Sequence, residues 1–194
     1  MSKLLCGNIK LTFIRHGKTA GNEQKRYIGI TDETLSDTGI KEVKQHINEG
    51  IYPEADVVFV SPMKRCIMTA GLIYPDSKVY VIDEFREIDF GTFEGKNYKE
   101  LSENPDYQRW IDSNGTMPFH NGESREEFIK RCIKGFIKML ELIHNEKEIV
   151  AVVHGGTIMA VLSELLGGDY YSYQIDNGKT ISCIVEDGKI VVSF

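Results

Sequence analysis

The chain has no hydrophobic run long enough to cross a membrane. Its longest apolar stretches, such as Ile149 to Val153, are the length of a strand, whereas a membrane-spanning helix needs about 20 mostly apolar residues. The segment Met1 to Cys6 holds too short an apolar run for a secretory signal. We therefore expect a cytoplasmic protein with no membrane partner.

Cysteine is scarce, and no linker divides the chain. The four cysteines, Cys6, Cys66, Cys132 and Cys183, lie far apart without a Cys-x-x-Cys pair, so neither a zinc site nor a disulfide framework is indicated. No Pro/Gly/Ser-rich tract or internal repeat interrupts the sequence. A chain of 194 residues can bury one core, and we expect a single domain over residues 1–194.

Positive charge is in deficit. Lys plus Arg number 23 and Asp plus Glu number 29, which gives a formal net charge of −6, and no run of Lys or Arg occurs. An acidic chain of this kind is a poor general binder of nucleic acid or anionic membranes. Any anion that the protein binds must therefore be held by a local cluster of cations.

Segments with the pattern of strands alternate with segments that have the pattern of helices. The predicted strands cover residues 9–14, 55–60, 78–82 and 148–153, followed by a hairpin of 181–185 and 189–193 around Asp187-Gly188. The predicted helices follow Ser36 or Asp37, Pro62, the Ser124-x-x-Glu127 capping box, and Gly156. This order predicts an α/β fold, a three-layer sandwich whose mostly parallel sheet is flanked by helices and has an antiparallel end.

Three of the predicted strands end in polar groups. These ends are Arg15-His16-Gly17, the segment from Ser61 to Arg65, and His154-Gly155-Gly156. Ligands of such sheets bind beyond the carboxyl ends of the strands, and guanidinium groups offer forked donors to phosphate or carboxylate oxygens. One His or Arg at a strand end is more often a surface or capping residue. The coincidence at three strand ends predicts a phosphate pocket, in which flanking glycines and a helix N-terminus add backbone N–H groups.

These segments resemble, in order, the motifs of the histidine phosphatase superfamily, also called phosphoglycerate mutase-like proteins. The resemblance covers Leu11 to Leu166. It rests on Arg15 to Thr19 with Asn22, on Ser61 to Ala70, on the acid-bearing loop from Glu84 to Gly95, on Gly122 to Ser124, and on Val153 to Gly156.

The resemblance implies a phosphohistidine enzyme with no cofactor and no metal. His16 is the expected nucleophile, and it must attack as neutral imidazole. Arg15, Arg65 and His154 are expected to hold the phosphoryl oxygens. Glu87 is the expected acid, which protonates the leaving alkoxide and later takes a proton from water.

Some assignments near this set stay open. Asn22 and Gly155 are expected to add substrate contacts, and Glu84 is the fallback for the acid. Ser61 either supports a catalytic histidine or caps the helix after Pro62. Glu123 and Ser124 are assigned to the start of a helix rather than to substrate.

Residues 96–122 form a predicted insertion or cap. They include no Arg-Arg pair of the kind that mutases in this superfamily often carry, and they contain Tyr98, Tyr107, Trp110, Phe119 and His120. Those aromatic side chains can stack on an organic leaving group, or simply pack the insertion onto the body. A small phosphorylated metabolite is the expected partner, and a phosphatase is favoured over a mutase.

The string from Arg86 to Gly91 looks most similar to the α-ribazole phosphatase branch, whose members act in cobalamin biosynthesis; α-ribazole 5′-phosphate is the candidate substrate. A cofactor-dependent phosphoglycerate mutase, a fructose-2,6-bisphosphatase-like sugar phosphatase, a catalytically silent phosphate-binding module and a homodimeric assembly stay open. A metal-dependent hydrolase with His16 and His154 as ligands is disfavoured because neighbouring arginines would repel the metal.

Overall fold

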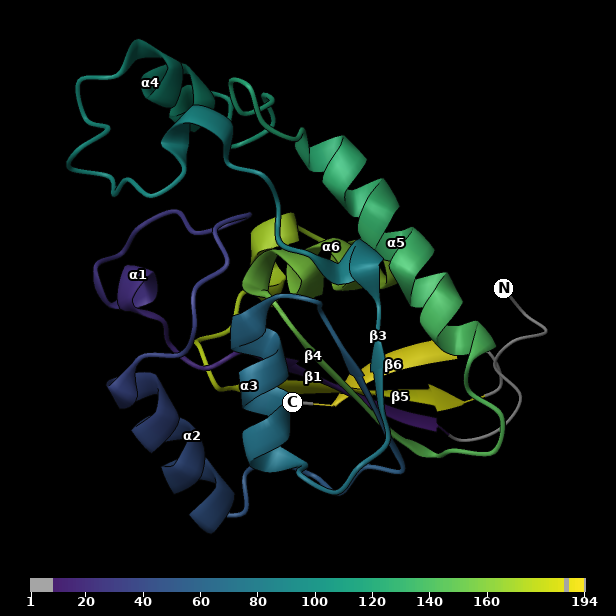
Figure 1. Cartoon of the computed structure of the whole chain (residues 1–194). Helices are drawn as coiled ribbons and strands as arrows, with labels where there is room; N and C mark the ends of the chain where they lie inside the picture. The colour runs from purple at the N-terminus through teal and green to yellow at the C-terminus, as the bar shows by residue number, and fades with distance from the viewer. Residues whose placement is uncertain (1–8, 187–188, 194) are drawn as a thin grey trace.

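One six-stranded sheet organises the computed structural model, which describes residues 9–186 and 189–193 (Figure 1). The strand order is β3-β2-β4-β1-β5-β6. The first four strands in this order are parallel, and β5 and β6 are antiparallel to their neighbours. The strands are β1 (Ile9–Arg15), β2 (Val57–Val60), β3 (Val79–Val81), β4 (Glu148–Val153), β5 (Thr180–Glu186) and β6 (Lys189–Ser193). The predicted α/β class and C-terminal hairpin are confirmed; Asp187-Gly188 and Met1 to Cys6 lie outside the described residues.

Helices cover both faces of this sheet. Successive strand residues point to opposite faces, so Phe13 packs in one buried cluster with α5 (Arg125–Glu141) and α6 (Gly155–Leu166), and Ile14 packs in another with α3 (Lys64–Ile73). In Figure 1, α2 (Asp37–Asn48) lies beside α3, away from α5. The predicted three layers are therefore confirmed. Within the described ranges, no helix has the length and apolar character needed to cross a membrane.

Local capping chemistry accounts for the starts of these helices. Ser36 accepts a hydrogen bond from the Gly39 N–H at the start of α2, and Ser124 forms the predicted capping box with Glu127 at the start of α5. The predicted helix after Pro62 is α3, but it begins at Lys64 with Met63 as its N-cap residue, so Pro62 lies just before the helix and not in its first turn. The Lys64 N–H is satisfied by Asp32 Oδ1, at 2.7 Å, across a different loop.

The segment 96–122, called the cap below, contains α4 (Pro105–Asp112) and lies to one side of the sheet (Figure 1). Trp110 of the cap lies with its ring centroid 6.2 Å from both Tyr27 and Phe93, and Phe119 lies 5.1 Å from Phe90. The cap is thus joined to the body through an aromatic cluster. The remaining short elements are α1 (Ala20–Glu23) and three 3₁₀ turns, η1 (Asp83–Phe85), η2 (Gly91–Phe93) and η3 (Tyr170–Tyr173).

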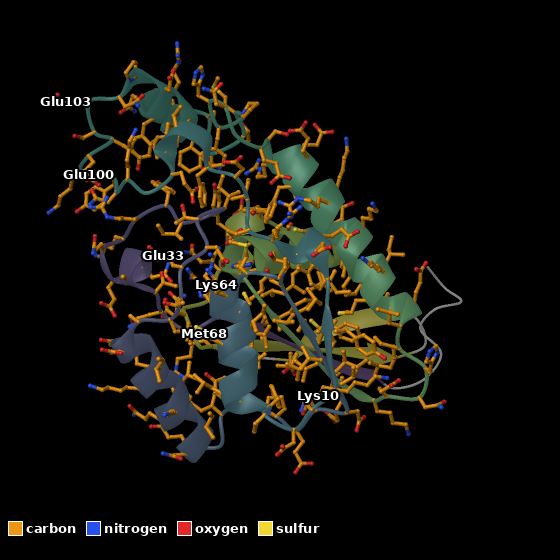
Figure 2. The ribbon with its side chains drawn as sticks, viewed as in Figure 1. Lys10, Glu33, Lys64, Met68, Glu100 and Glu103 are labelled. Atoms are coloured by element: carbon orange, nitrogen blue, oxygen red, sulfur yellow. The ribbon has the colours of Figure 1, made fainter. Side chains whose placement is uncertain are left out.

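Charged side chains lie mainly on the outside. In Figure 2 the labelled Lys10, Glu100 and Glu103 stand at the periphery of the molecule. Arg65 and Glu87 are different, since only 1% and 9% of their surfaces are exposed. Buried charged groups are rare unless they are paired or functional. These two side chains therefore indicate a candidate functional site near the strand ends.

Candidate active site

The carboxyl ends of three neighbouring strands bring the predicted motifs together. Strand β4 lies between β1 and β2, and the His16 N–H donates to the Val153 carbonyl at 3.0 Å. The rings of His16 and His154 consequently lie 5.2 Å apart between centroids, in an edge-to-face arrangement. The three polar strand ends therefore form one cluster, as the sequence predicts.

Hydrogen bonding assigns the proton on the His16 ring. His16 Nδ1 lies 2.7 Å from the Gly17 carbonyl oxygen, which can only accept, so Nδ1 carries the hydrogen and donates. The other ring nitrogen, Nε2, is then unprotonated. Burial, followed by the positive charges of Arg65 and Arg15, holds the pKa of His16 well below 6.5. His16 is thus a neutral imidazole with a lone pair on Nε2.

Arg65 is held behind the two histidines. Its Nη1 donates to the Thr31 carbonyl and its Nη2 to the Gly29 carbonyl, both at 2.8 Å, and its Nε donates to His154 Nδ1 at 3.2 Å. The guanidinium is thereby fixed in one orientation. Its charge lowers the pKa of both buried histidines, second in effect only to desolvation.

His154 has the opposite tautomer to His16. Because its Nδ1 accepts from Arg65, its Nε2 carries the hydrogen and donates to Ser61 Oγ, 2.7 Å away. Ser61 therefore supports this histidine, and Met63, not Ser61, is the N-cap residue of α3. Both ring nitrogens of His154 have protein partners, so its expected contact with phosphoryl oxygens requires one of these bonds to be exchanged.

Arg15 and Asn22 present donors to an open space. Arg15 Nη1 donates to the Ile175 carbonyl at 2.7 Å, whereas its buried Nε has no hydrogen-bond partner among the described residues. Asn22 Oδ1 accepts from the Thr19 N–H and from Asn177 Nδ2, at 3.1 and 3.3 Å, which leaves the Asn22 amide N–H groups to donate. Because an unpaired buried donor is unfavourable, an anion bound beside Arg15 would stabilise the site.

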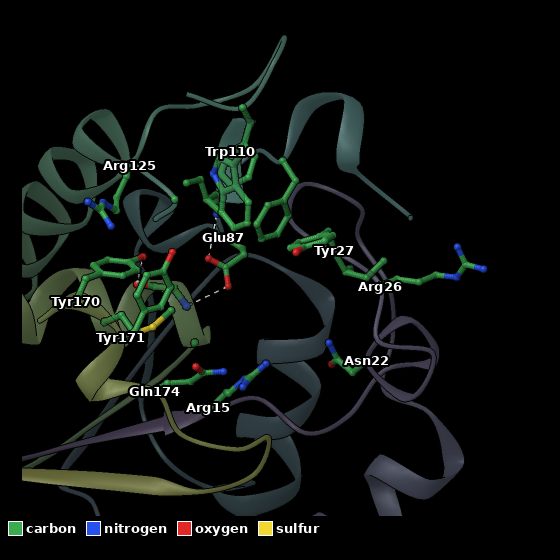
Figure 3. A pocket seen from close by; sticks show the side chains of 18 of the residues that line it. Arg15, Asn22, Arg26, Tyr27, Glu87, Trp110, Arg125, Tyr170, Tyr171 and Gln174 are labelled. Atoms are coloured by element: carbon green, nitrogen blue, oxygen red, sulfur yellow. Dashed lines mark hydrogen bonds between the residues drawn. The ribbon is translucent and has the colours of Figure 1, made fainter. Parts of the chain in front are cut away.

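Glu87 lies against the start of α6. Its Oε1 accepts from the Ile88 N–H at 3.0 Å and its Oε2 from the Gly156 N–H at 3.2 Å (Figure 3). Burial raises the pKa of Glu87 above 4.5, against the opposing effects of these N–H groups and of Arg65. A Cβ at residue 156 would lie 2.2 Å from Oε1, so any residue other than glycine there would displace the Glu87 carboxylate. The fallback, Glu84, instead points to Lys138 and Lys134, 3.3 and 3.8 Å away, on the outside of α5.

These groups line a cavity of about 270 Å³. Arg15, His16, Asn22, Glu87 and Gly155 line it, whereas Arg65 and His154 lie behind the lining. Among the insertion's named aromatic residues, Trp110 and Phe119 line the cavity, and Tyr98, Tyr107 and His120 do not. Sequence reasoning missed Arg26, Tyr27, Arg125, Met159, Tyr170, Tyr171 and Gln174 as further lining residues (Figure 3).

A sequence model of the histidine phosphatase superfamily (branch 1) matches residues 11–193. The chain belongs to this superfamily. It is 31% identical over 191 residues to phosphoserine phosphatase 1 of Hydrogenobacter thermophilus, which covers 95% of this chain and 90% of the relative. It is 27% identical to the adenosylcobalamin/α-ribazole phosphatase of Escherichia coli, over 88% of this chain and 87% of that protein.

Solved structures of the superfamily share the fold. A phosphoserine phosphatase variant from Entamoeba histolytica, in complex with phosphoserine, has a TM-score of 0.82 and 28% identity, and the match covers 96% of this chain and 95% of that one. The α-ribazole phosphatase from Shigella flexneri has a TM-score of 0.82 at 24% identity, over 95% of each chain, which shows the fold alone. As a histidine phosphatase, the protein is a phosphoric monoester hydrolase.

One assignment in the histidine phosphatase motifs needs correction. Glu123 was assigned to the start of α5, and Ser124 does cap that helix. The Glu123 carboxylate instead pairs with Arg131, with Oε1 2.9 Å from Nε and Oε2 2.6 Å from Nη2. Glu123 precedes the N-cap residue Ser124, so no i,i+3 or i,i+4 helical spacing in the sequence signals this pair.

Proposed function

We propose that this protein hydrolyses small phosphoric monoesters through a phosphohistidine at His16, without a metal ion. The observation that carries the proposal is the tautomer of His16. Its Nδ1–H is bound to the Gly17 carbonyl and its ring is kept neutral, so Nε2 offers a lone pair in the cavity that also holds Arg15 and Glu87. A neutral nucleophile, anion-binding donors and an acid are the groups that phosphoryl transfer requires.

The reaction has two balanced steps. First, Nε2 of His16 attacks phosphorus in line, the P–O ester bond breaks, and Glu87 gives its proton to the departing oxygen. Water then attacks the phosphohistidine, Glu87 takes a proton from that water, and the P–N electron pair returns to Nε2. Arg15 and Asn22 hold the phosphoryl oxygens, while Arg65 and His154 supply charge and alignment from behind.

Trapping the intermediate tests this proposal. The protein is mixed with a ³²P-labelled ester in excess EDTA and quenched during turnover. We expect an acid-labile, base-stable label on the wild type and on His144→Ala, which changes an exposed histidine far from the cavity, and no label or phosphate release with His16→Ala. Turnover by His16→Ala, or complete inhibition by EDTA, would count against a metal-free phosphohistidine mechanism.

The cavity also bears on the leaving group. Tyr27, Trp110, Phe119, Tyr170 and Tyr171 line it, which supports an organic leaving group in contact with aromatic rings. The relatives described above are named for different substrates. α-Ribazole 5′-phosphate, which the resemblance of the acid-bearing loop favours, is therefore one candidate among several.

A substrate panel separates these candidates. It contains α-ribazole 5′-phosphate, fructose 2,6-bisphosphate, phosphoserine, 3-phosphoglycerate and simple aryl phosphates. Phosphate release from one ester far above the others names the substrate. Interconversion of 2- and 3-phosphoglycerate with 2,3-bisphosphoglycerate present would identify a mutase, and a chain that forms no phosphoenzyme would be a silent binding module. A cytoplasmic location and a homodimer stay predictions.

A further inference from the structure

A further positive group lines the cavity, away from the expected phosphate site. Arg125, the first residue of α5, lines the same cavity as Arg15. Figure 3 shows Arg125 and Trp110 on one side of Glu87, and Arg15 and Asn22 on the other. The Arg125 guanidinium lies over the Tyr170 ring, 5.3 Å from its centroid. No salt bridge to Arg125 is found among residues 9–186.

The start of α5 gives no electrostatic reason for a cation at this position. A helix N-terminus carries a partial positive charge and is stabilised by acidic side chains. The first turn of α5 has these in Glu126 and Glu127, and the capping box of Ser124 and Glu127 satisfies its N–H groups. Arg125 therefore works against the helix dipole, and its presence there is better explained by the cavity it lines.

The neighbouring polar groups are also donors. The Trp110 Nε1–H is buried without a hydrogen-bond partner in the described part of the chain, and neither an indole nor a guanidinium can accept a hydrogen bond. Arg26, another lining cation, already pairs with Glu100 at 2.7 Å. Glu87 is the one carboxylate among the described residues that line the cavity. This end of the cavity thus has two unpaired cationic or N–H donor side chains and, within the described ranges, no carboxylate to match them.

We propose that Arg125 is a specificity-determining residue that binds a carboxylate on the leaving group of the substrate, with Trp110 Nε1 donating a further hydrogen bond. The planar guanidinium matches a carboxylate in two parallel hydrogen bonds. One guanidinium balances a carboxylate but not a second phosphate of nearly two negative charges. The substrate is then a small phosphorylated carboxylic acid. This inference rests on the proposed function of the same cavity.

Two pairs of esters isolate the carboxylate. 3-Phosphoglycerate carries it where glycerol 3-phosphate has a hydroxymethyl group, and phosphoserine carries it where phosphoethanolamine has hydrogen. We expect the wild type to have the higher kcat/KM for the acid in each pair. Arg125→Gln should lower the ratio of kcat/KM within each pair by roughly 10- to 100-fold, mainly through KM, because a hydrogen-bonded charge pair is lost. Arg125→Lys should lower it less, and Trp110→Phe should lower it by a smaller factor.

Lys130→Gln is the matched control. It removes one positive charge from the same helix, but Lys130 pairs with Glu126, at 2.6 Å, outside the cavity. We expect Lys130→Gln to leave both ratios unchanged. An equal fall with Lys130→Gln, an unchanged ratio with Arg125→Gln and Arg125→Lys, or a wild-type preference for α-ribazole 5′-phosphate over all acids would overturn the inference. If only this inference fails, the wild type still forms a phosphoenzyme on His16. If no ester gives a phosphoenzyme, the proposed function itself fails.

Discussion

At the residue scale, the partners of two neighbouring histidines give them complementary roles. A carbonyl acceptor puts the hydrogen of His16 on Nδ1, whereas the Arg65 donor puts the hydrogen of His154 on Nε2. Both rings stay neutral because burial and two guanidinium groups disfavour a further cation. His16 therefore keeps an unprotonated Nε2, as the proposed attack on phosphorus requires, while His154 accepts a hydrogen bond from Arg65.

Replacing Glu87 should affect esters according to their leaving groups. Glu87→Gln keeps the size of the side chain but cannot give up a proton to an alkoxide. We expect kcat/KM, which reports transfer of the phosphoryl group to His16, to fall by roughly 10²- to 10⁴-fold for alkyl phosphates. For p-nitrophenyl phosphate, whose leaving group needs no protonation, kcat/KM should fall much less. Steady-state rates across a series of leaving-group pKa values measure this difference.

Glu84→Gln is the control for that series. The Glu84 carboxylate faces Lys134 and Lys138 on the outside of α5, so we expect its rates to match those of the wild type. If Glu87→Gln slowed activated and unactivated esters equally, Glu87 would not be the acid. If Glu84→Gln showed the leaving-group dependence, the two assignments would be reversed.

At the element scale, α5 holds the acid-bearing loop in place through one side chain. Arg131 Nη1 donates to the carbonyls of Glu84 and Arg86, both at 2.8 Å, and Nη2 donates to the Glu87 carbonyl at 3.3 Å. The guanidinium is itself oriented by its two contacts with Glu123. A helix that packs on the sheet thus fixes the backbone from which Glu87 projects, so Arg131 is a positioning residue.

Removing this support should shift the leaving-group dependence. Arg131→Ala leaves three loop carbonyls without their donor. We expect the alkyl-to-aryl ratio of kcat/KM to fall by roughly tenfold, with a loss of about 1–3 kcal/mol in the free energy of unfolding. Arg131→Lys should recover part of both. Lys134→Ala, on the exposed side of α5, should change neither. Lower stability with an unchanged ratio would mean that Arg131 supports the fold alone.

Features that depend on neighbouring residues could be predicted from the sequence, whereas contacts between distant segments could not. Strand ends and helix caps follow from neighbouring residues, so the cluster of Arg15, His16 and His154 was predictable. Contacts between distant segments were not. Asn177 donates a hydrogen bond to Asn22, which lies 155 positions away in the sequence. The tyrosines of η3 line one side of the cavity. Neither segment has a sequence pattern that predicts these contacts. The bond from the Lys64 N–H at the start of α3 to Asp32 likewise joins distant segments.

At the scale of the whole molecule, an acidic protein keeps a positively charged site by burying it. The net charge is −6, yet Arg65 is buried at the edge of the sheet and donates hydrogen bonds to two carbonyls and to His154. The surrounding sheet and helices exclude water, which strengthens the field of the arginines on the histidines. The fold therefore couples its own stability to the protonation of the site.

The sign of this coupling predicts that stability falls with acidification. Below pH 6.5 the unfolded chain protonates His16 and His154, while the native protein, in which both pKa values lie well below 6.5, does not. The unfolded state then binds more protons, so the free energy of unfolding decreases by up to about 1.4 kcal/mol per pH unit for each histidine. Urea midpoints between about pH 7 and pH 5.5 measure the slope.

The carboxyl group of Glu87 has the opposite effect on the pH dependence of stability. Its contribution has to be removed before that of the histidines can be measured. Because its pKa is raised in the native protein, the native state takes up that proton before the unfolded chain does, which favours folding as pH falls through the raised value. In a Glu87→Gln background the histidines act without this opposing group. Adding His16→Gln should then reduce the slope by about half, whereas adding His144→Gln, at an exposed position, should leave it unchanged. An equal slope in all three proteins would mean that His16 protonates in the folded state as readily as in the unfolded chain, and its neutral, nucleophilic form would lose its physical basis.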